Sequence, residues 1–402
     1  MTRFERLLVL ANIGAFLAFL PLLVLLLPRR VEAVAGGDPL VLLSWLLLIG
    51  GITAGVAHVV AGAWSDRWAA RRGTRRGMIA LGLVATMIAF ALLAIARTPP
   101  LLVAGMIAFQ SCFNLMFAPL GVLLADHVPD ARKGLVAGGM NMALPIGGFG
   151  IAALGWLSDA DAIWPFVLVA GAVAACVLPL LLFWPQDTAF AASTHRAEAA
   201  PRLVLLRGDF ARAWAARLFV QLGAASIIGY LFLYVDALAS AARGFAAPDS
   251  SAGVATLTFI ANLVGLGAGV VAGHLSDRIE RRRAPLVIAS IVAGGALALL
   301  AWAPDWRLIL AAYAVFTAAL TAFLSIDSAL VAQLVGDRPQ RGALLGLMNL
   351  TNTLPAVIAP LAALTLSSGG VTGGDSLRWL LVFAALASIL AALFIARIRS
   401  IA

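Results

Sequence analysis

The chain has 402 residues, of which 62% are hydrophobic and only 12% charged, and its formal net charge at pH 7 is +9. The positive charge is scattered over short segments and forms no basic face, which argues against a nucleic-acid-binding protein. Apolar runs such as 163–184 are long enough to cross a bilayer, because about 20 apolar residues span its hydrocarbon core as a helix. The composition therefore excludes a soluble globular protein and predicts an integral membrane protein.

Twelve apolar segments follow one another along the chain. Each is predicted to be a membrane-spanning helix, because backbone groups in lipid must be hydrogen-bonded within their own segment. The expected ranges are 7–28, 39–61, 77–97, 100–125, 135–157, 163–184, 210–238, 252–273, 285–304, 307–335, 343–366 and 377–396. The first segment has the flanks of a signal peptide but is too long for its core, so we count it as a span. The expected fold class is all-α and integral to the membrane.

The longest polar stretch lies halfway along the chain, at about 186–209, and is predicted to be a cytoplasmic linker. It separates an N-terminal bundle of six spans, 1–185, from a C-terminal bundle of six spans, 210–402. Most of the 28 Lys and Arg residues fall at the two termini, in the linker and in alternate loops. Positive loops stay in the cytoplasm. We therefore expect a multi-pass protein of a bacterial-type inner membrane, with both termini cytoplasmic.

A short charged phrase closes the second span of each half. Its first copy contains Gly62, Asp66 and Arg67, and its second copy contains Gly273, Asp277 and Arg278 at the same spacing. A later pair of phrases repeats in the same order: Lys133-Gly134 and Met140-Asn141 correspond to Arg341-Gly342 and Met348-Asn349. Two independent matches in the same order indicate that the two halves are copies of one six-helix bundle.

The aspartate of the repeated phrase lies at the C-terminal end of a helix, where the helix dipole disfavours a negative charge. Neighbouring arginines or the positive N-terminus of another helix must therefore stabilise it. By symmetry, the helix beginning near Gly342 would hold Asp66, and the helix beginning near Gly134 would hold Asp277. The glycine four residues earlier would let a partner helix approach closely. We interpret the phrase as a gate at the cytoplasmic face; the alternative is a charged loop that only fixes topology.

These phrases resemble the loop signature of the major facilitator superfamily, and the likeness covers nearly the whole chain. The long first loop, 66–76, is similar to that of the sucrose-type and glycoside–pentoside–hexuronide branches, as are Asp327 and the segment 352–355. The resemblance implies two pseudo-symmetric six-helix bundles and secondary transport by alternating access. An arginine present in the fourth span of many proton-coupled relatives is absent here.

Polar side chains are distributed unevenly among the spans. The third, sixth, ninth and twelfth spans contain no Asn, Gln, His, Asp or Glu, and every other span contains at least one. Helices that face lipid exclude such groups, whereas helices along a wet path accept them. We therefore expect every third helix to be peripheral. The residues expected to contact the substrate or the coupling ion are Asp327, His58, Asn114, Gln110, Asn141, Asn349 and Asn352.

Asp327 is the strongest single candidate. It precedes Asp337 by ten residues, so it lies roughly 15 Å from the cytoplasmic loop at ~1.5 Å per residue. A charge near mid-bilayer costs about 2.5–3.5 kcal/mol, so Asp327 must be protonated or paired. Asp327 would suit proton coupling; the alternative is that it only joins two helices by a hydrogen bond. The same alternative applies to His58. We expect Arg217 to reach back toward the cytoplasmic surface and Asp236 to be solvated at the outer mouth.

The sequence shows no catalytic constellation, no metal-ligand spacing and no phosphate-binding loop, so we predict neither an enzyme nor a metal or cofactor site. We predict a monomeric, proton-coupled transporter of a small organic solute, with a sugar or glycoside as the first substrate class. Pro145, Gly147 and Gly148 loosely resemble a fifth-span motif of antiporters, which leaves a proton-coupled exporter of drugs or other lipophilic compounds as an alternative. A non-transporting sensor or assembly factor on the same fold is the third possibility.

Overall fold

The computed structural model describes residues 1–157, 163–184, 208–241, 244–279, 282–335, 341–369 and 374–398. Most of the predicted linker, and the side chains of Asp277 and Arg278, lie outside the described part of the chain. All elements in the described ranges are helices, and 11 continuous helical stretches, some of which join two or three of these elements, are long and apolar enough to cross a membrane. The number rises to 12 when α9 (Gly208–Ile228) and α10 (Leu231–Ser240) are counted as one bent span. The predicted all-helical membrane fold is confirmed.

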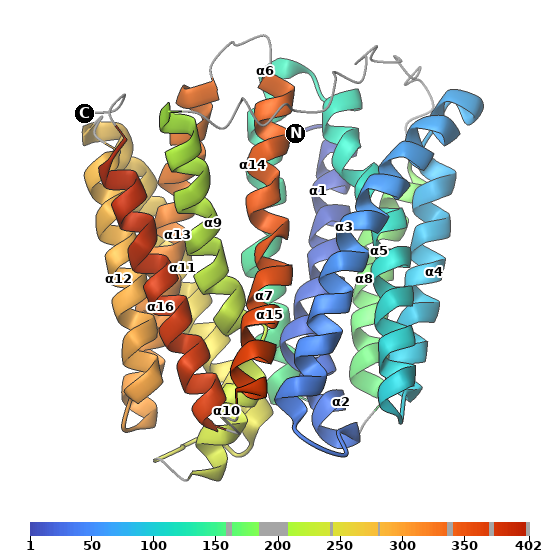
Figure 1. The fold of residues 1–402 in the computed structure, drawn as a ribbon. Coiled ribbons are helices and arrows are strands. Elements are labelled where there is room, and N and C mark those ends of the chain that lie inside the picture. The colour runs from blue at the N-terminus through green and yellow to red at the C-terminus, as the bar shows by residue number, and fades with distance from the viewer. Residues whose placement is uncertain are drawn as a thin grey trace. The chain divides into compact units, whose positions relative to one another are not determined.

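The chain divides into two compact units, Met1–Thr194 and His195–Ala402, here called unit 1 and unit 2 (Figure 1). Unit 1 contains α1 (Arg3–Pro21), η1 (Leu22–Leu26), α2 (Leu27–Val34), α3 (Pro39–Arg72), α4 (Arg76–Ile95), α5 (Pro99–His127), α6 (Asp130–Asn141), α7 (Ala143–Leu157) and α8 (Trp164–Leu182). Unit 2 contains α9, α10, α11 (Ser250–Ile279), α12 (Arg283–Trp302), α13 (Trp306–Val335), α14 (Arg341–Thr353), α15 (Pro355–Ser368) and α16 (Gly374–Ala396). The order of long and short helices is similar in the two units, as expected for a duplicated bundle.

The first and fifth spans are interrupted in both units. In unit 1 the first span changes from α-helix to the π-helical turn η1 after Pro21, and in unit 2 α9 and α10 meet at an angle of 46°. The fifth span breaks at Met142 between α6 and α7, and its counterpart breaks at Leu354, before Pro355. Proline cannot donate the backbone hydrogen bond that would continue the helix. The internal repeat therefore extends to the positions of the helix breaks.

Small residues bring α11 and α13 close together in unit 2. A methyl group at Gly269 would lie 2.9 Å from Cγ2 of Thr321, and one at Gly273 would lie 3.2 Å from Oγ of Ser325. Glycines spaced by four residues lie on one helix face and allow such close packing. A methyl group at Gly62 would meet no described atom within 4 Å. A close approach is thus found at Gly273, to α13 of its own unit, and the contacts of the repeated phrase with helices of the other half stay predictions.

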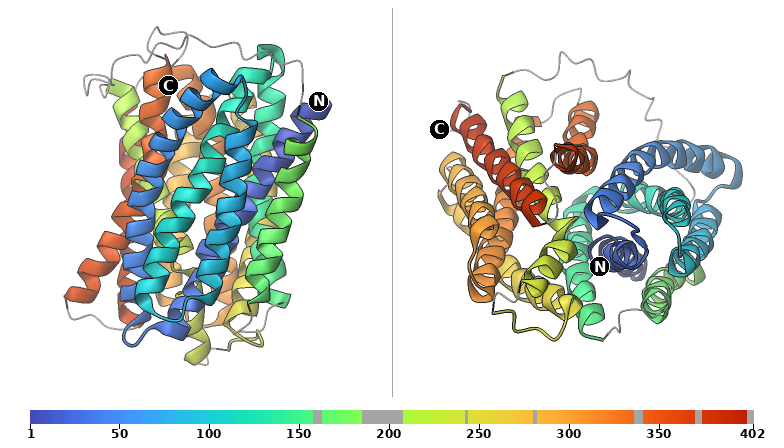
Figure 2. Two further views of the ribbon diagram at one scale, coloured as in Figure 1. Left: turned by 90° about the vertical axis from the view of Figure 1, so that its right-hand side faces the viewer. Right: turned by 60° about the horizontal axis from the view of Figure 1, so that its bottom comes forward.

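Within each unit the helices run side by side (Figure 2). Those of the third and sixth spans carry exposed apolar faces. In unit 1, α4 packs against α5 and α8, and in unit 2, α12 packs against α13 and α16. The exposed residues of α4 include Leu81, Val84, Ile88 and Leu92, at the spacing of one helix face. This face is suited to contact with lipid.

Candidate functional site

A buried ion pair joins α9 to α13 in unit 2. Nη1 of Arg217 donates to Oδ2 of Asp327 over 3.0 Å, and the two side chains are 20% and 2% exposed. Each charge alone would be costly in a low-dielectric environment, and pairing offsets much of that cost. The expectation that Arg217 reaches back toward the cytoplasmic surface is wrong, because its guanidinium turns to this carboxylate. Asp327 is paired in the structure, one of the two states expected for it.

Three amide side chains extend the ion pair onto α14. Nε2 of Gln221 donates to Oδ1 of Asn352 over 2.9 Å, and Nδ2 of Asn352 donates to Oδ1 of Asn349 over 3.0 Å. Nη2 of Arg217 lies 3.5 Å from the same Asn352 oxygen. Asn349 and Asn352 are exposed, whereas Asp327 is buried. We call these five residues the unit 2 network; Arg217 and Gln221 are the members that the sequence analysis did not assign to the site.

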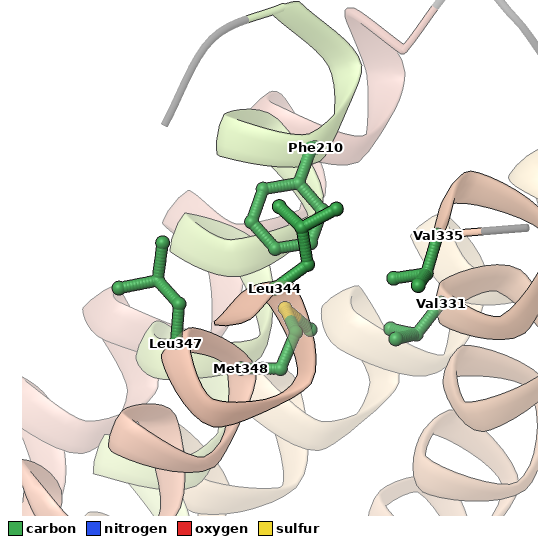
Figure 3. Packing of buried hydrophobic residues seen from close by; sticks show 6 residues of the cluster. All are labelled: Phe210, Val331, Val335, Leu344, Leu347 and Met348. Carbon is green, nitrogen blue, oxygen red and sulfur yellow. The ribbon is translucent and has the colours of Figure 1, made fainter. Parts of the chain in front are cut away.

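An apolar cluster packs α9, α13 and α14 together beside the unit 2 network. It consists of Phe210, Val331, Val335, Leu344, Leu347 and Met348 (Figure 3). Val331 follows Asp327 by one helical turn, and Met348 precedes Asn352 by one turn. The indole N–H of Trp214, which packs against the cluster, donates to the backbone oxygen of Leu347 over 2.8 Å. The cluster packs together the three helices that carry the network.

A second polar group joins α3 to α5 in unit 1. Nδ1 of His58 lies 3.0 Å from Oδ1 of Asn114, and Nδ2 of Asn114 donates to the backbone oxygen of Gln110 over 2.8 Å. Gln110 and Asn114 are 2% and 5% exposed, and His58 is exposed. The ring of Phe117 is tilted beside that of His58, with centroids 6.1 Å apart. The predicted residues His58, Asn114 and Gln110 therefore come together in the structure.

Asn141 joins neither polar group. It is the last residue of α6 and is exposed, whereas its repeat partner Asn349 belongs to the unit 2 network. The carbonyl of the preceding residue, Met140, accepts a hydrogen bond from Nδ2 of the buried Asn12 over 3.0 Å. Asn12 thus satisfies a backbone group freed by the break between α6 and α7. The pseudo-symmetry of the backbone does not extend to these side chains.

The first copy of the charged phrase lies in an ion-pair cluster around Arg75. Nη1 of Arg75 is 2.8 Å from Oδ1 of Asp66 and 2.6 Å from Oγ of Ser65, and its Nε is 3.0 Å from Oδ2 of Asp126. Arg75 and Asp126 are 4% and 6% exposed, whereas Asp66 is 67% exposed. Of the two kinds of partner expected for Asp66, unit 1 supplies the arginine. Arg67 is exposed.

Comparison with known proteins places these features in a family context. The sequence pattern of the Major Facilitator Superfamily matches residues 6–270 and 237–401. A bacterial homolog of the human lysosomal transporter Spinster, inward-facing and unoccupied, is similar at a TM-score of 0.73 and 15% identity, over 98% of this chain and 97% of that chain. A variant of the nucleoside transporter NupG is similar at a TM-score of 0.74 and 13% identity, over 99% of this chain and 100% of that chain. The search of curated proteins found no match.

Proposed function

Because the chain belongs to the Major Facilitator Superfamily, we propose that it is a proton-coupled secondary transporter of a small hydroxylated solute, working by alternating access. Its family and the transporters that share its fold indicate a membrane transporter and not an enzyme. The coupling ion and the solute are inferred from the unit 2 network.

The ion pair between Arg217 and Asp327 is the observation that carries proton coupling. Protonation of Asp327 would remove its charge, while the guanidinium stays charged throughout the accessible pH range. The weakened contact would free Arg217 to turn to Oδ1 of Asn352, which already lies 3.5 Å from its Nη2. Because Gln221 and Asn349 are bonded to the same amide, one proton would rearrange the whole network. A proton and a solute that both act on this network would be coupled.

The amide end of the network supports a neutral, hydroxylated solute. The ion pair has no net charge, and the hydrogen bonds among the described residues leave Nδ2 of Asn349 as a donor and Oε1 of Gln221 as an acceptor. A hydroxyl group both donates and accepts, so it matches this combination. A sugar or glycoside is the favoured class, in agreement with the loop resemblance to the sucrose-type and glycoside–pentoside–hexuronide branches.

The remaining parts of the proposal concern gating and placement in the cell. The cluster of Asp66, Arg75 and Asp126 supports a gate at the cytoplasmic end of α3. The other proposed gate residues are Gly62, Arg67, Gly273, Asp277 and Arg278. Asn141 and the polar group of His58, Asn114 and Gln110 stay candidates for substrate contact. We propose that the protein is a monomer in the inner membrane. The distribution of basic residues favours a cytoplasmic linker over 186–209 and two cytoplasmic termini.

An exporter of lipophilic compounds is the second candidate. Phe109, Phe113 and Phe117 stack along α5 with centroids 5.5 and 5.2 Å apart, and aromatic faces bind apolar and cationic groups. Phe109 and Phe113 are buried, however, and only Phe117 is partly exposed. A single partly exposed ring gives less support than five polar residues joined in one network.

Transport by purified protein in proteoliposomes tests these functions against one another. A pH gradient is imposed, and accumulation of radiolabelled methyl glycosides is compared with accumulation of a lipophilic cation, with and without a protonophore. Protonophore-sensitive accumulation of a glycoside is expected. Accumulation of the cation alone would favour the exporter, and transport of neither would favour a non-transporting sensor.

A further inference from the structure

The amide of Asn114 is fixed in orientation, and this determines the tautomer of His58. Nδ2 of Asn114 donates to the backbone oxygen of Gln110 over 2.8 Å. A flipped amide would place its oxygen against that carbonyl, so that two acceptors would meet with no hydrogen between them. Oδ1 therefore faces His58, and Nδ1 of the imidazole, 3.0 Å away, must carry the hydrogen. A neutral His58 then presents Nε2 as an unprotonated acceptor.

Two acceptors in this seam between α3 and α5 are left without donors. The His58 ring is exposed, and no described residue is seen to donate to its Nε2. Oε1 of Gln110 is buried without a hydrogen-bond partner, one helical turn from Asn114. The Gln110 side chain lies against α3 at Gly50, where a methyl group would be 3.6 Å from its Nε2. A buried acceptor without a donor is unfavourable, so this site is built to receive one.

We propose that His58, Asn114 and Gln110 form a subsite that binds the hydrogen-bond donors of a neutral ring compound. The inference rests on the proposed function for the arrival of a hydroxylated solute, and it names the part of that solute recognised in unit 1. A hydroxyl group on the edge of a sugar ring would donate to the exposed Nε2 of His58, and a second hydroxyl group that enters the seam between α3 and α5 would donate to the buried Oε1 of Gln110. The Phe117 ring, 6.1 Å from that of His58, gives the apolar face of the sugar a flat surface.

The same chemistry disfavours ligands that offer only hydrogen-bond acceptors to these two atoms. A carboxylate or phosphate offers only acceptors and would meet the two acceptors of the subsite. A sugar whose hydroxyls are methylated keeps its ring but has no donors. Asn114 itself is a positioning residue, because its amide oxygen accepts from His58 and its amide nitrogen donates to the backbone oxygen of Gln110.

Nitrogen-15 NMR of the full chain in nanodiscs, labelled at its four histidines, tests the proposal directly. The His58 signals are assigned with His58→Asn, which keeps a donor toward Asn114 but has no Nε2. We expect the Nδ1–H tautomer in the wild type. Methyl α-D-glucopyranoside and its tetra-O-methyl ether are then titrated in parallel. Only the unmethylated glycoside should shift the Nε2 signal.

Matched variants separate specific binding from a general effect. Gln110→Leu and His58→Asn should each weaken binding of methyl α-D-glucopyranoside by roughly three- to tenfold, the factor expected from one neutral hydrogen bond. His274→Asn is the control, because Nδ1 of His274 lies 2.9 Å from the backbone oxygen of Val270 on its own helix. Thermal unfolding of each variant shows that it is folded.

Three results would overturn the proposal: an Nε2–H tautomer of His58, an equal response to both probes, or no response to either. In the last case, Gln110 holds only a buried water. The test is independent of proton coupling. Proton-driven glycoside uptake with a silent His58 would refute the subsite alone, and a responding His58 without proton-driven uptake would refute the proposed coupling alone.

Discussion

Arg217 on α9 and Asp327 on α13 are 110 residues apart in sequence and form an ion pair of 3.0 Å. Asp327 is almost fully buried, so its charge depends on the guanidinium for compensation. Arg217 lies close to the amide of Asn352 on α14. Val331, a member of the apolar cluster against which Trp214 packs, follows Asp327 by one helical turn. A change in protonation at Asp327 would therefore act on three helices at once.

Removing one partner of the ion pair should destabilise the protein strongly. Arg217→Gln would leave the carboxylate of Asp327 buried without its partner and should lower the free energy of unfolding by about 3 kcal/mol. The loss should shrink at acid pH, because protonation of Asp327 removes the stranded charge. Adding Asp327→Asn should restore most of the lost stability. Thermal unfolding of the purified variants at two pH values measures these effects.

A matched control for this prediction lies on the same helix. Arg212 pairs with Asp209 near the start of α9, and its side chain is 35% exposed. Arg212→Gln should cost less than about 1 kcal/mol, as usual for exposed pairs. If the double variant at Arg217 and Asp327 is no more stable than Arg217→Gln alone, the buried pair does not have the role assigned to it.

The two carboxylates that hold Arg75 should differ in their effect on stability. Asp126 is 6% exposed, so Asp126→Asn should lower the free energy of unfolding by about 1–3 kcal/mol. Asp66 is 67% exposed, and Asp66→Asn should cost no more than ~1 kcal/mol. Thermal unfolding compares the two variants. A larger loss for Asp66→Asn would show that the exposed contact is the structural one.

The gate proposal predicts a separate, conformational effect of Asp66→Asn. If Asp66 stabilises only the outward-open state, losing its charge should shift the population several-fold toward the inward-open state. Cysteines introduced on the cytoplasmic side of the transport path should label faster, and those on the outer side more slowly. Arg71→Gln, at an exposed position of the same loop, should change labelling much less. Unchanged labelling in Asp66→Asn would make the phrase a topology signal only.

The packing of α11 against α13 predicts opposite effects for two neighbouring glycines. Gly269→Ala would place a methyl group 2.9 Å from Cγ2 of Thr321 and should destabilise the protein by about 1–3 kcal/mol. Gly267→Ala has no described atom within 4 Å of the new methyl group. It should stabilise the helix by up to about 1 kcal/mol, the difference in helix propensity. A shift of the same sign for both variants in thermal unfolding would contradict this packing.

Fusion reporters test the proposed orientation. A reporter active only after export should be silent when fused after Ala402 and active when inserted in the 239–251 loop. The reason is the concentration of basic residues at the termini and in alternate loops. The reverse pattern of activity would show that both termini lie outside the cytoplasm.

The sequence was sufficient for the helices and for the expectation that Asp327 is paired or protonated, because long apolar runs and a lone carboxylate within one are strong signals. It also predicted that Gln110 and Asn114 share a face, since their spacing is that of one helical turn. Pairings between distant helices were beyond it. Whether Arg217 meets Asp327 depends on how α9 and α13 are rotated about their axes, and apolar residues on every side of both helices leave that rotation undetermined.

The undetermined rotation and packing of the helices also explain the other differences between the sequence-based predictions and the structure. Asp126 lies near a helix end, where an acidic residue is normally expected to be solvated. Only the packing of α3, α4 and α5 around Arg75 shows that its side chain is buried. Both breaks have a sequence signal in a proline, Pro355 directly after the break at Leu354 and Pro145 three residues after the break at Met142. Gly62 and Gly273 have the same sequence context but different neighbours in space.

The central claim is that Asp327 carries the coupled proton, and pH-driven transport by Asp327→Asn tests it most directly. Asparagine keeps the size of the side chain and an oxygen that can accept from Arg217, but its amide takes up no proton at the pH values used for transport. In proteoliposomes the variant should bind and exchange the solute while failing to accumulate it against a gradient when a pH difference is imposed. Asp236→Asn is the control, because Asp236 is bonded to Ser250 and lies outside the unit 2 network. Normal, protonophore-sensitive accumulation by Asp327→Asn would contradict the account.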